Sequence, residues 1–190
     1  QQDNLFKGLG LFIEAIRPYI VSVLIQESGD RWPAKFVDSL SPDQKIKWNQ
    51  GIKNGSQPEA LIDFPHLKSF AIQNKNILKH DFDRKGNDLP NWLGEIYEVR
   101  NKIAHFQEVD EDEATKAWIH MKSIATILKM DELETEIKWL REGKAVTAVT
   151  NNANNQTGLA PWFRVVSPHL DIKQGRLDES VFAANLAEVA

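Results

Sequence analysis

Helical spacing of the apolar residues is the feature that most constrains the fold of this chain. Between residues 4 and 141, apolar side chains recur every three or four positions, and no stretch of any length shows the alternation of a half-buried strand. The cleanest example is the segment 110–128, which begins at the capping residue Asp110. Its apolar positions are Ala114, Ala117, Trp118, Met121, Ile124, Ala125 and Leu128. We therefore predict that residues 1–143 form an all-α domain.

Caps, prolines and glycines divide this pattern into separate helices. We expect a long first helix over 4–27, kinked or split at Pro18, because proline removes a backbone donor and crowds the preceding turn. Ser41 followed by Pro42, and Asp88 followed by Pro90, are typical helix starts. The polar stretch 80–88 is expected to be a loop. The helices predicted after the first cover 31–40, 42–53, 64–79, 88–105, 110–128 and 131–141.

Composition excludes several classes of protein. The chain has no cysteine, so disulfides and thiolate zinc sites are excluded. No run approaches the ~20 consecutive apolar residues that a membrane span needs, and residues 1–4 lack the basic start of a signal peptide. We therefore predict a cytoplasmic protein that does not bind a membrane. The net charge of −4 argues against broad, salt-dependent binding to nucleic acid, which disfavours a DNA-binding adaptor.

Charge is nevertheless uneven along the chain. The segment 67–85 is rich in Lys and Arg, whereas the segment 108–113 carries five carboxylates. Carboxylates stabilise the N-terminus of a helix, so the start of the next helix explains this acidic segment. A basic segment can follow an RNA backbone, although a solvated surface is the simpler explanation. The candidate RNA-binding residues are Lys75, Lys79, Arg84 and, within the central motif described below, Lys102.

Residues 98–106, Glu-Val-Arg-Asn-Lys-Ile-Ala-His-Phe, contain the closely spaced polar set that best suits chemistry. Arginine as a residue type keeps its charge at every relevant pH, and histidine is the residue type suited to proton transfer near neutral pH. On a regular helix the five-residue spacing separates Arg100 and His105 by about 140°, whereas Asn101 and His105 share a face. Because its side chain is long, Arg100 has the reach to swing toward that face.

If these side chains converge on RNA, each has a role that follows from its type. His105 can take a proton from a 2′-hydroxyl or give one to the leaving 5′-oxygen. Arg100 can hold the phosphate, and Asn101 can orient the imidazole. No metal or other cofactor is predicted, since carboxylates are not grouped with histidine in ligand spacing. The structural alternative is that Arg100 is paired with a carboxylate and His105 merely ends the helix.

The segment 98–106 resembles the signature of the HEPN superfamily, in which Arg is followed by a polar residue, three more residues and His. Residues 10–24 are similar to the first helix of the HEPN variant found at the N-terminus of large ATPases in prokaryotic defence islands. Residues 161–171, with Gly175-Arg176 and the segment 182–186, are similar to the entry into the ATPase region of those proteins.

The resemblance implies a HEPN-type bundle of about four long helices plus short ones. It also implies a homodimer in which two motifs face each other, and metal-independent ribonuclease activity in antiviral defence. Arg100 and His105 would be the catalytic pair, with Asn101 as a polar helper. The alternative is a non-catalytic module that dimerises the ATPase or docks a partner.

Three regions follow from these patterns. Residues 1–143 are the predicted HEPN domain, and 144–160, which includes an Asn-rich stretch, are a predicted flexible linker. Residues 161–190 are predicted to be the truncated start of an ATPase-like C-terminal domain. No Gly-x4-Gly-Lys-Ser/Thr loop occurs in the 190 residues, so we expect no ATP hydrolysis from them.

Overall fold

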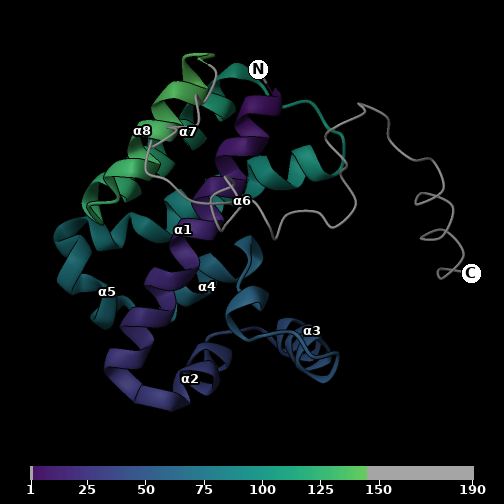
Figure 1. Cartoon of the computed structure of the whole chain (residues 1–190), viewed down its shortest axis with the longest axis vertical. Helices are drawn as coiled ribbons and strands as arrows, with labels where there is room; N and C mark the ends of the chain where they lie inside the picture. The colour runs from purple at the N-terminus through teal and green to yellow at the C-terminus, as the bar shows by residue number, and fades with distance from the viewer. Residues whose placement is uncertain (1, 145–190) are drawn as a thin grey trace, which may run out of the picture. The chain divides into compact units, whose positions relative to one another are not determined.

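The computed structural model describes residues 2–144, which are mostly helical and contain no strand. The all-α prediction is confirmed. The predicted linker beyond Lys144 and the predicted ATPase-like segment lie outside the described residues. The elements are α1 (Gln2–Ser28), η1 (Gly29–Arg31), α2 (Trp32–Asp38), α3 (Pro42–Lys53), η2 (Glu59–Leu61), α4 (Phe64–Gln73), α5 (Lys75–Phe82), η3 (Asp83–Asn87), α6 (Leu89–Ala104), α7 (Glu111–Ile127) and α8 (Asp131–Arg141) (Figure 1).

Helix α1 is the element around which the others pack. It contacts α2, α5, α6, α7 and α8, and Figure 1 shows it running through the bundle. Contrary to the sequence-based expectation, the helical stretch Gln2–Asp38 is long and apolar enough to cross a membrane by those criteria alone. Its packing in the bundle core is a sufficient reason for that composition. The buried residues at helical spacing are Leu5, Leu9, Phe12, Ile16, Ile20 and Leu24.

The remaining long helices form an antiparallel series. Near the start of α4, Asp63 contacts Arg100, and one turn further on Lys68 packs against Gly94, so α4 and α6 run in opposite directions. Side-chain contacts also join α6 to α7, α7 to α8, and the start of α1 to the end of α8. These contacts are Lys102 with Glu113, Lys122 with Glu134, and the Asn4 amide with the Leu140 carbonyl.

Two boundaries differ from the sequence-based prediction. Asn74 is buried and leaves helical geometry with φ −112° and ψ 27°, and its side-chain amide shares the Phe70 carbonyl with its own backbone N–H, both at 3.0 Å. The predicted helix 64–79 is therefore divided at Asn74 into α4 and α5. The predicted loop 80–88 is largely helical, because burial of Phe82 extends α5 and η3 follows it. Pro18 lies on the exposed side of α1, which is not split.

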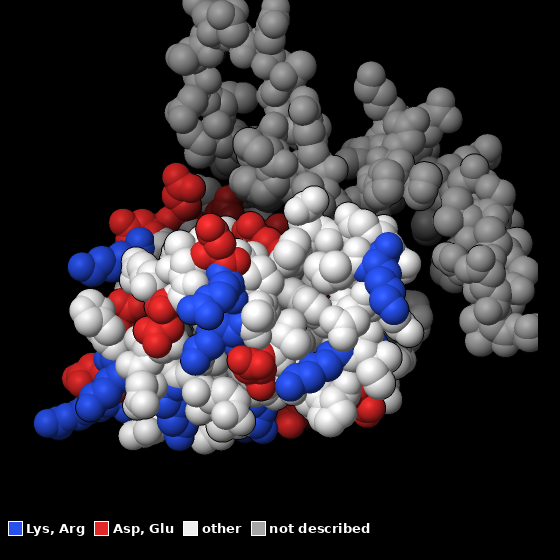
Figure 2. Space-filling view, turned by 90° about the horizontal axis from the view of Figure 1, so that it is seen from below, with Lys and Arg blue, Asp and Glu red and all other residues white. Residues whose placement is uncertain are grey.

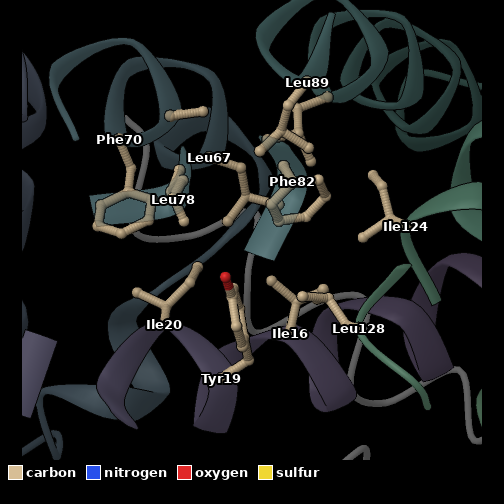
Figure 3. Close-up of a pocket in the computed structure, with 12 residues that line it drawn as sticks. Ile16, Tyr19, Ile20, Leu67, Phe70, Leu78, Phe82, Leu89, Ile124 and Leu128 are labelled. Atoms are coloured by element: carbon tan, nitrogen blue, oxygen red, sulfur yellow. The ribbon is translucent and has the colours of Figure 1, made fainter. Parts of the chain in front are cut away.

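The core is closely packed and contains a small hollow. The hollow has a volume of about 20 Å³, room for roughly one water molecule. Figure 3 shows Ile16 and Ile20 of α1 facing Leu67 of α4 and Phe82 of α5 across it. Tyr19 also borders it, and burial together with the hydrogen bond to Asp81 raises the pKa of the Tyr19 hydroxyl. Its apolar lining and size identify a packing imperfection rather than a ligand site.

Tryptophan burial is uneven. Trp48 and Trp118 are buried in the core, whereas Trp32, Trp92 and Trp139 are only partly buried. Trp118 on α7 lies directly against Gly8 on α1. This contact brings the backbone of α1 close to the ring and leaves no room for a side chain at position 8.

Candidate functional site

Helix α6 ends in a tight turn at the predicted motif. The Phe106 N–H donates to the Ile103 carbonyl at 3.1 Å, and the Gln107 N–H donates to the Lys102 carbonyl at 2.8 Å. This pair of bonds is the Schellman arrangement, which requires a left-handed residue just past the helix end. Phe106 occupies that position with φ 54° and is 94% exposed. The motif therefore ends at a sharply defined and solvent-exposed tip.

Asn101 and His105 lie one helical turn apart on this tip. The His105 backbone N–H donates to the Asn101 carbonyl at 3.1 Å, so the two side chains leave α6 on the same side. The His105 side chain is exposed and Asn101 is half-buried. Among residues 2–144, no hydrogen bond or ion pair involves the His105 ring. The imidazole is therefore accessible to a ligand from solvent.

Arg100 points to a different neighbour. Its Nη2 lies 3.6 Å from Oδ2 of Asp63, the residue that caps the start of α4. Within residues 2–144, no hydrogen bond or ion pair joins the Arg100 side chain to Asn101 or His105. A single chain thus brings Asn101 and His105 together on one face and directs Arg100 toward α4. Pairing of Arg100 with a neighbouring helix was the structural alternative for this residue.

No local sequence pattern indicated that Asp63 would meet Arg100. Asp63 is followed by Phe64, Pro65 and His66, which is a helix-start pattern, and its role as a cap was recoverable from that spacing. The Asp63 Oδ1 accepts from the Phe64 N–H at 2.8 Å, and His66 Nδ1 accepts from the Asp63 N–H at 3.1 Å. Only the packing of α4 on α6 adds Arg100 to this group.

His66 is held neutral in this cap. Burial lowers its pKa from 6.5, and nearby Lys47 acts in the same direction, while Asp63 opposes them. Because the folded chain binds this proton less readily than the unfolded chain, His66 contributes full stability above about pH 6.5. That contribution is lost as the pH falls from there through the folded-state pKa.

We therefore expect the wild-type chain to lose more stability between pH 7.5 and pH 5 than the variant His66→Gln. Glutamine can accept the same Asp63 N–H in a capping box but does not titrate. Urea unfolding followed by circular dichroism at several pH values measures the difference. Parallel pH profiles for the two proteins would contradict a neutral His66.

The four candidate RNA-binding residues do not form one surface. Lys102 is paired with Glu113, and that hydrogen bond raises the pKa of Lys102. Lys75, Lys79 and Arg84 are exposed on α5 and η3, and none of them forms an ion pair within residues 2–144. Their elements, α5 and η3, adjoin the start of α6. The 16 residues of α6 span about 24 Å, so these side chains lie at the end of α6 opposite to His105. Figure 2 shows one face of the molecule, on which both signs of charge are interspersed.

Other polar clusters in the described part have structural roles. His120 Nε2 lies 2.9 Å from Glu95 Oε2, and its ring stacks on Trp92 with centroids 5.6 Å apart, which ties α7 to α6. His80 is exposed beside Asp81. Between residues 2 and 144, no group of three or more His, Asp or Glu side chains has a metal-binding arrangement. His169 lies outside the described residues.

An all-α bundle with an Arg-Asn-x3-His sequence at an exposed helix end has the defining features of a HEPN-type domain. The family model for Swt1-like HEPN domains matches residues 7–129, which include Arg100, Asn101 and His105. The match covers more than half of the 190 residues, and the chain therefore belongs to the Swt1-like HEPN family. Comparison with curated proteins and with solved structures found no match. Membership assigns the general class of nuclease or RNA-binding domain.

Proposed function

We propose that this chain is a metal-independent endoribonuclease domain that acts as a homodimer. The observation that carries the proposal is the exposed His105 at the tip of α6, with Asn101 on the same face, inside the region that matches the family. The full-length protein would join this domain to a C-terminal ATPase region and serve in antiviral defence. Those two assignments rest on the likeness of residues 10–24 and 161–190 to such proteins.

The proposal of a dimer is supported by what one chain lacks. Arg100 is directed toward Asp63, whereas His105 stands at the tip, so a site shared by two copies supplies the arginine of one chain beside the histidine of the other. The tip also exposes Phe106, a large apolar side chain that association would cover. The start of α1 lies beside this tip, since the Gln2 amide contacts the Gln107 carbonyl at 3.5 Å.

The chemistry is transesterification within RNA. One histidine removes the proton of a 2′-hydroxyl, whose oxygen attacks the adjacent phosphorus, and the bond to the 5′-oxygen breaks. The same His105, now protonated, gives that proton to the leaving oxygen. Arg100 neutralises the charge that builds on the phosphorane oxygens, and Asn101 orients the imidazole. The products are a 2′,3′-cyclic phosphate and a 5′-hydroxyl.

The test is incubation of the purified chain with single-stranded RNA in excess EDTA, followed by analysis of the ends. Cleavage in EDTA with 2′,3′-cyclic phosphate ends is the expected result. Strict dependence on Mg²⁺, or 3′-hydroxyl ends, would rule out this mechanism. Light scattering on the same sample measures the mass of the dimer.

We further propose that Lys75, Lys79 and Arg84 attract the RNA backbone at the other end of α6. Replacing all three by glutamine is expected to weaken RNA binding and to reduce the salt dependence of log K by about 2, near 0.7 per lost phosphate contact. Titrations at several salt concentrations measure this slope. The matched control replaces the exposed Lys53, Lys116 and Lys138 by glutamine, which removes the same charge from three other helices. Equal slopes for both variants would show a general charge effect.

The second candidate function is a non-catalytic dimerisation or partner-docking module. The pairing of Arg100 with Asp63 favours it, because in one chain the arginine and His105 do not converge. Both functions predict a dimer by light scattering, so that measurement does not separate them. Absence of cleavage by a well-folded dimer, with and without metal ions, would favour this second function.

A further inference from the structure

We infer that Asp63 is the positioning residue for Arg100, a fixed carboxylate at the start of α4 that holds the guanidinium in place at the RNA-cleaving site. This inference rests on the proposed function. It assigns a role in the reaction to a residue that lies 37 positions before Arg100 and outside the motif. The contacts around Asp63, the geometry of the ion pair and the chemistry of helix caps carry the argument.

The backbone of Asp63 is held from both sides. On one side, the Nε of Arg17 donates to the carbonyl of the preceding residue, Ile62, at 2.7 Å, and Ile62 is fully buried. On the other side, the Asp63 N–H donates to His66 Nδ1 at 3.1 Å, and the Phe64 N–H donates to Asp63 Oδ1 at 2.8 Å. The main chain and one carboxylate oxygen are therefore fixed before Arg100 is considered.

The other carboxylate oxygen is the one that faces Arg100. Oδ2 lies 3.6 Å from Nη2, a distance of an ion pair rather than a close hydrogen bond. Arginine has five N–H donors, and this contact involves only one of its terminal nitrogens. The Arg100 side chain is 35% exposed, so its remaining donors are accessible to a phosphate. A restrained arginine also loses less rotamer freedom when it binds the reacting phosphate.

Helix capping alone does not explain an aspartate at this position. Asparagine caps a helix start about as well as aspartate. A half-exposed ion pair between surface side chains also adds little stability. The charge of Asp63 is therefore expected to act on Arg100 more than on the fold. The variant Asp63→Asn separates the two roles, because it keeps the cap and removes the charge.

The experiment compares Asp63→Asn with Asp110→Asn. Asp110 caps α7 through the same capping box but has no arginine partner within residues 2–144, so its variant is the matched control. Asp63→Asn is expected to reduce the single-turnover rate of RNA cleavage by about 10- to 100-fold, as loss of alignment does. The melting temperature and the dimer mass are expected to stay unchanged. RNA affinity is also expected to stay unchanged, and it is measured in chains that carry His105→Ala as well, so that the RNA is not cleaved. Asp63→Asn is expected to have no further effect on the residual rate of Arg100→Ala.

Several results would overturn the inference. An unchanged rate in Asp63→Asn would show that Arg100 needs no positioning, and a faster rate would show that Asp63 restrains Arg100 instead. An equal loss in Asp110→Asn would point to helix capping.

If the wild-type chain does not cleave RNA, the proposed function fails on its own, and the NMR signal of the Arg100 Nε–H then tests the contact. Asp63→Asn should shift and broaden that signal, and an unchanged signal would contradict the pairing.

Discussion

Replacing either Arg100 or His105 by alanine is expected to reduce the rate of RNA cleavage by about 100-fold or more, while helicity and dimer mass stay unchanged. Loss of a general acid–base group costs about 10²- to 10⁴-fold in rate. Loss of a preorganised positive donor to the phosphorane costs about 10²- to 10³-fold. Both side chains are at least partly exposed, so their removal leaves the core intact. Single-turnover cleavage of a labelled RNA in EDTA measures the effect.

A mixed dimer tests whether the site is shared between chains. A dimer of one Arg100→Ala chain and one His105→Ala chain has no intact pair within either chain. If the arginine of one chain works with the histidine of the other, this dimer retains one complete pair and recovers activity. Purification through two different tags isolates it. An inactive mixed dimer would place both residues in the same chain.

The exposed His80 provides the matched control for these variants, since His80→Ala removes an imidazole that is 92% exposed and lies outside the motif. Its cleavage rate is expected to equal that of the wild-type chain. Cleavage at the wild-type rate in both Arg100→Ala and His105→Ala would show that the motif is not the catalytic site.

The second large effect is on stability and concerns the contact between α1 and α7. Replacing Gly8 by alanine is expected to destabilise the fold by about 1–3 kcal/mol, as overpacking of a close-packed core does. The added Cβ would overlap the six-membered ring of Trp118, which is rigid and only 4% exposed. Chemical unfolding followed by circular dichroism measures the free energy of unfolding.

Gly10 on the same helix makes the matched control. It is exposed, and a Cβ at this position meets no other atom within 4 Å. Gly10→Ala is therefore expected to stabilise α1 by about 0.5–1 kcal/mol, because alanine loses less backbone entropy in a helix. Gly8→Ala should also become stabilising when Trp118 is replaced by the smaller leucine. Destabilisation that persists in that background would exclude the ring as the cause.

Local features of the fold were predictable because their causes lie within one or two helical turns. The capping boxes of Ser41 and Asp110 are formed as their spacing indicates, and α3 and α7 begin where those caps predict. The division at Asn74 was missed, because an isolated asparagine within a helical pattern gives no strong signal. Its effect comes from burial, which forces the amide to find a partner in the preceding turn.

The tip of α6 was predictable only in part. The helix end at His105 agrees with the sequence pattern, but nothing in the sequence indicated a left-handed turn at Phe106, where glycine is the usual residue. The hydrogen bonds from the Phe106 N–H to the Ile103 carbonyl and from the Gln107 N–H to the Lys102 carbonyl offset the conformational cost of the left-handed Phe106. The turn leaves Phe106 beside the predicted catalytic histidine.

The sequence by itself determined the helical class, most helix boundaries and the shared face of Asn101 and His105. These depend on the fixed rise and rotation of a helix, which act between residues three or four apart. Only the tertiary structure decided where Arg100 points. Its partner Asp63 is distant in sequence and is brought within 3.6 Å by the packing of α4 against α6. A contact of that kind depends on how two helices bury their apolar faces, and no local spacing specifies it.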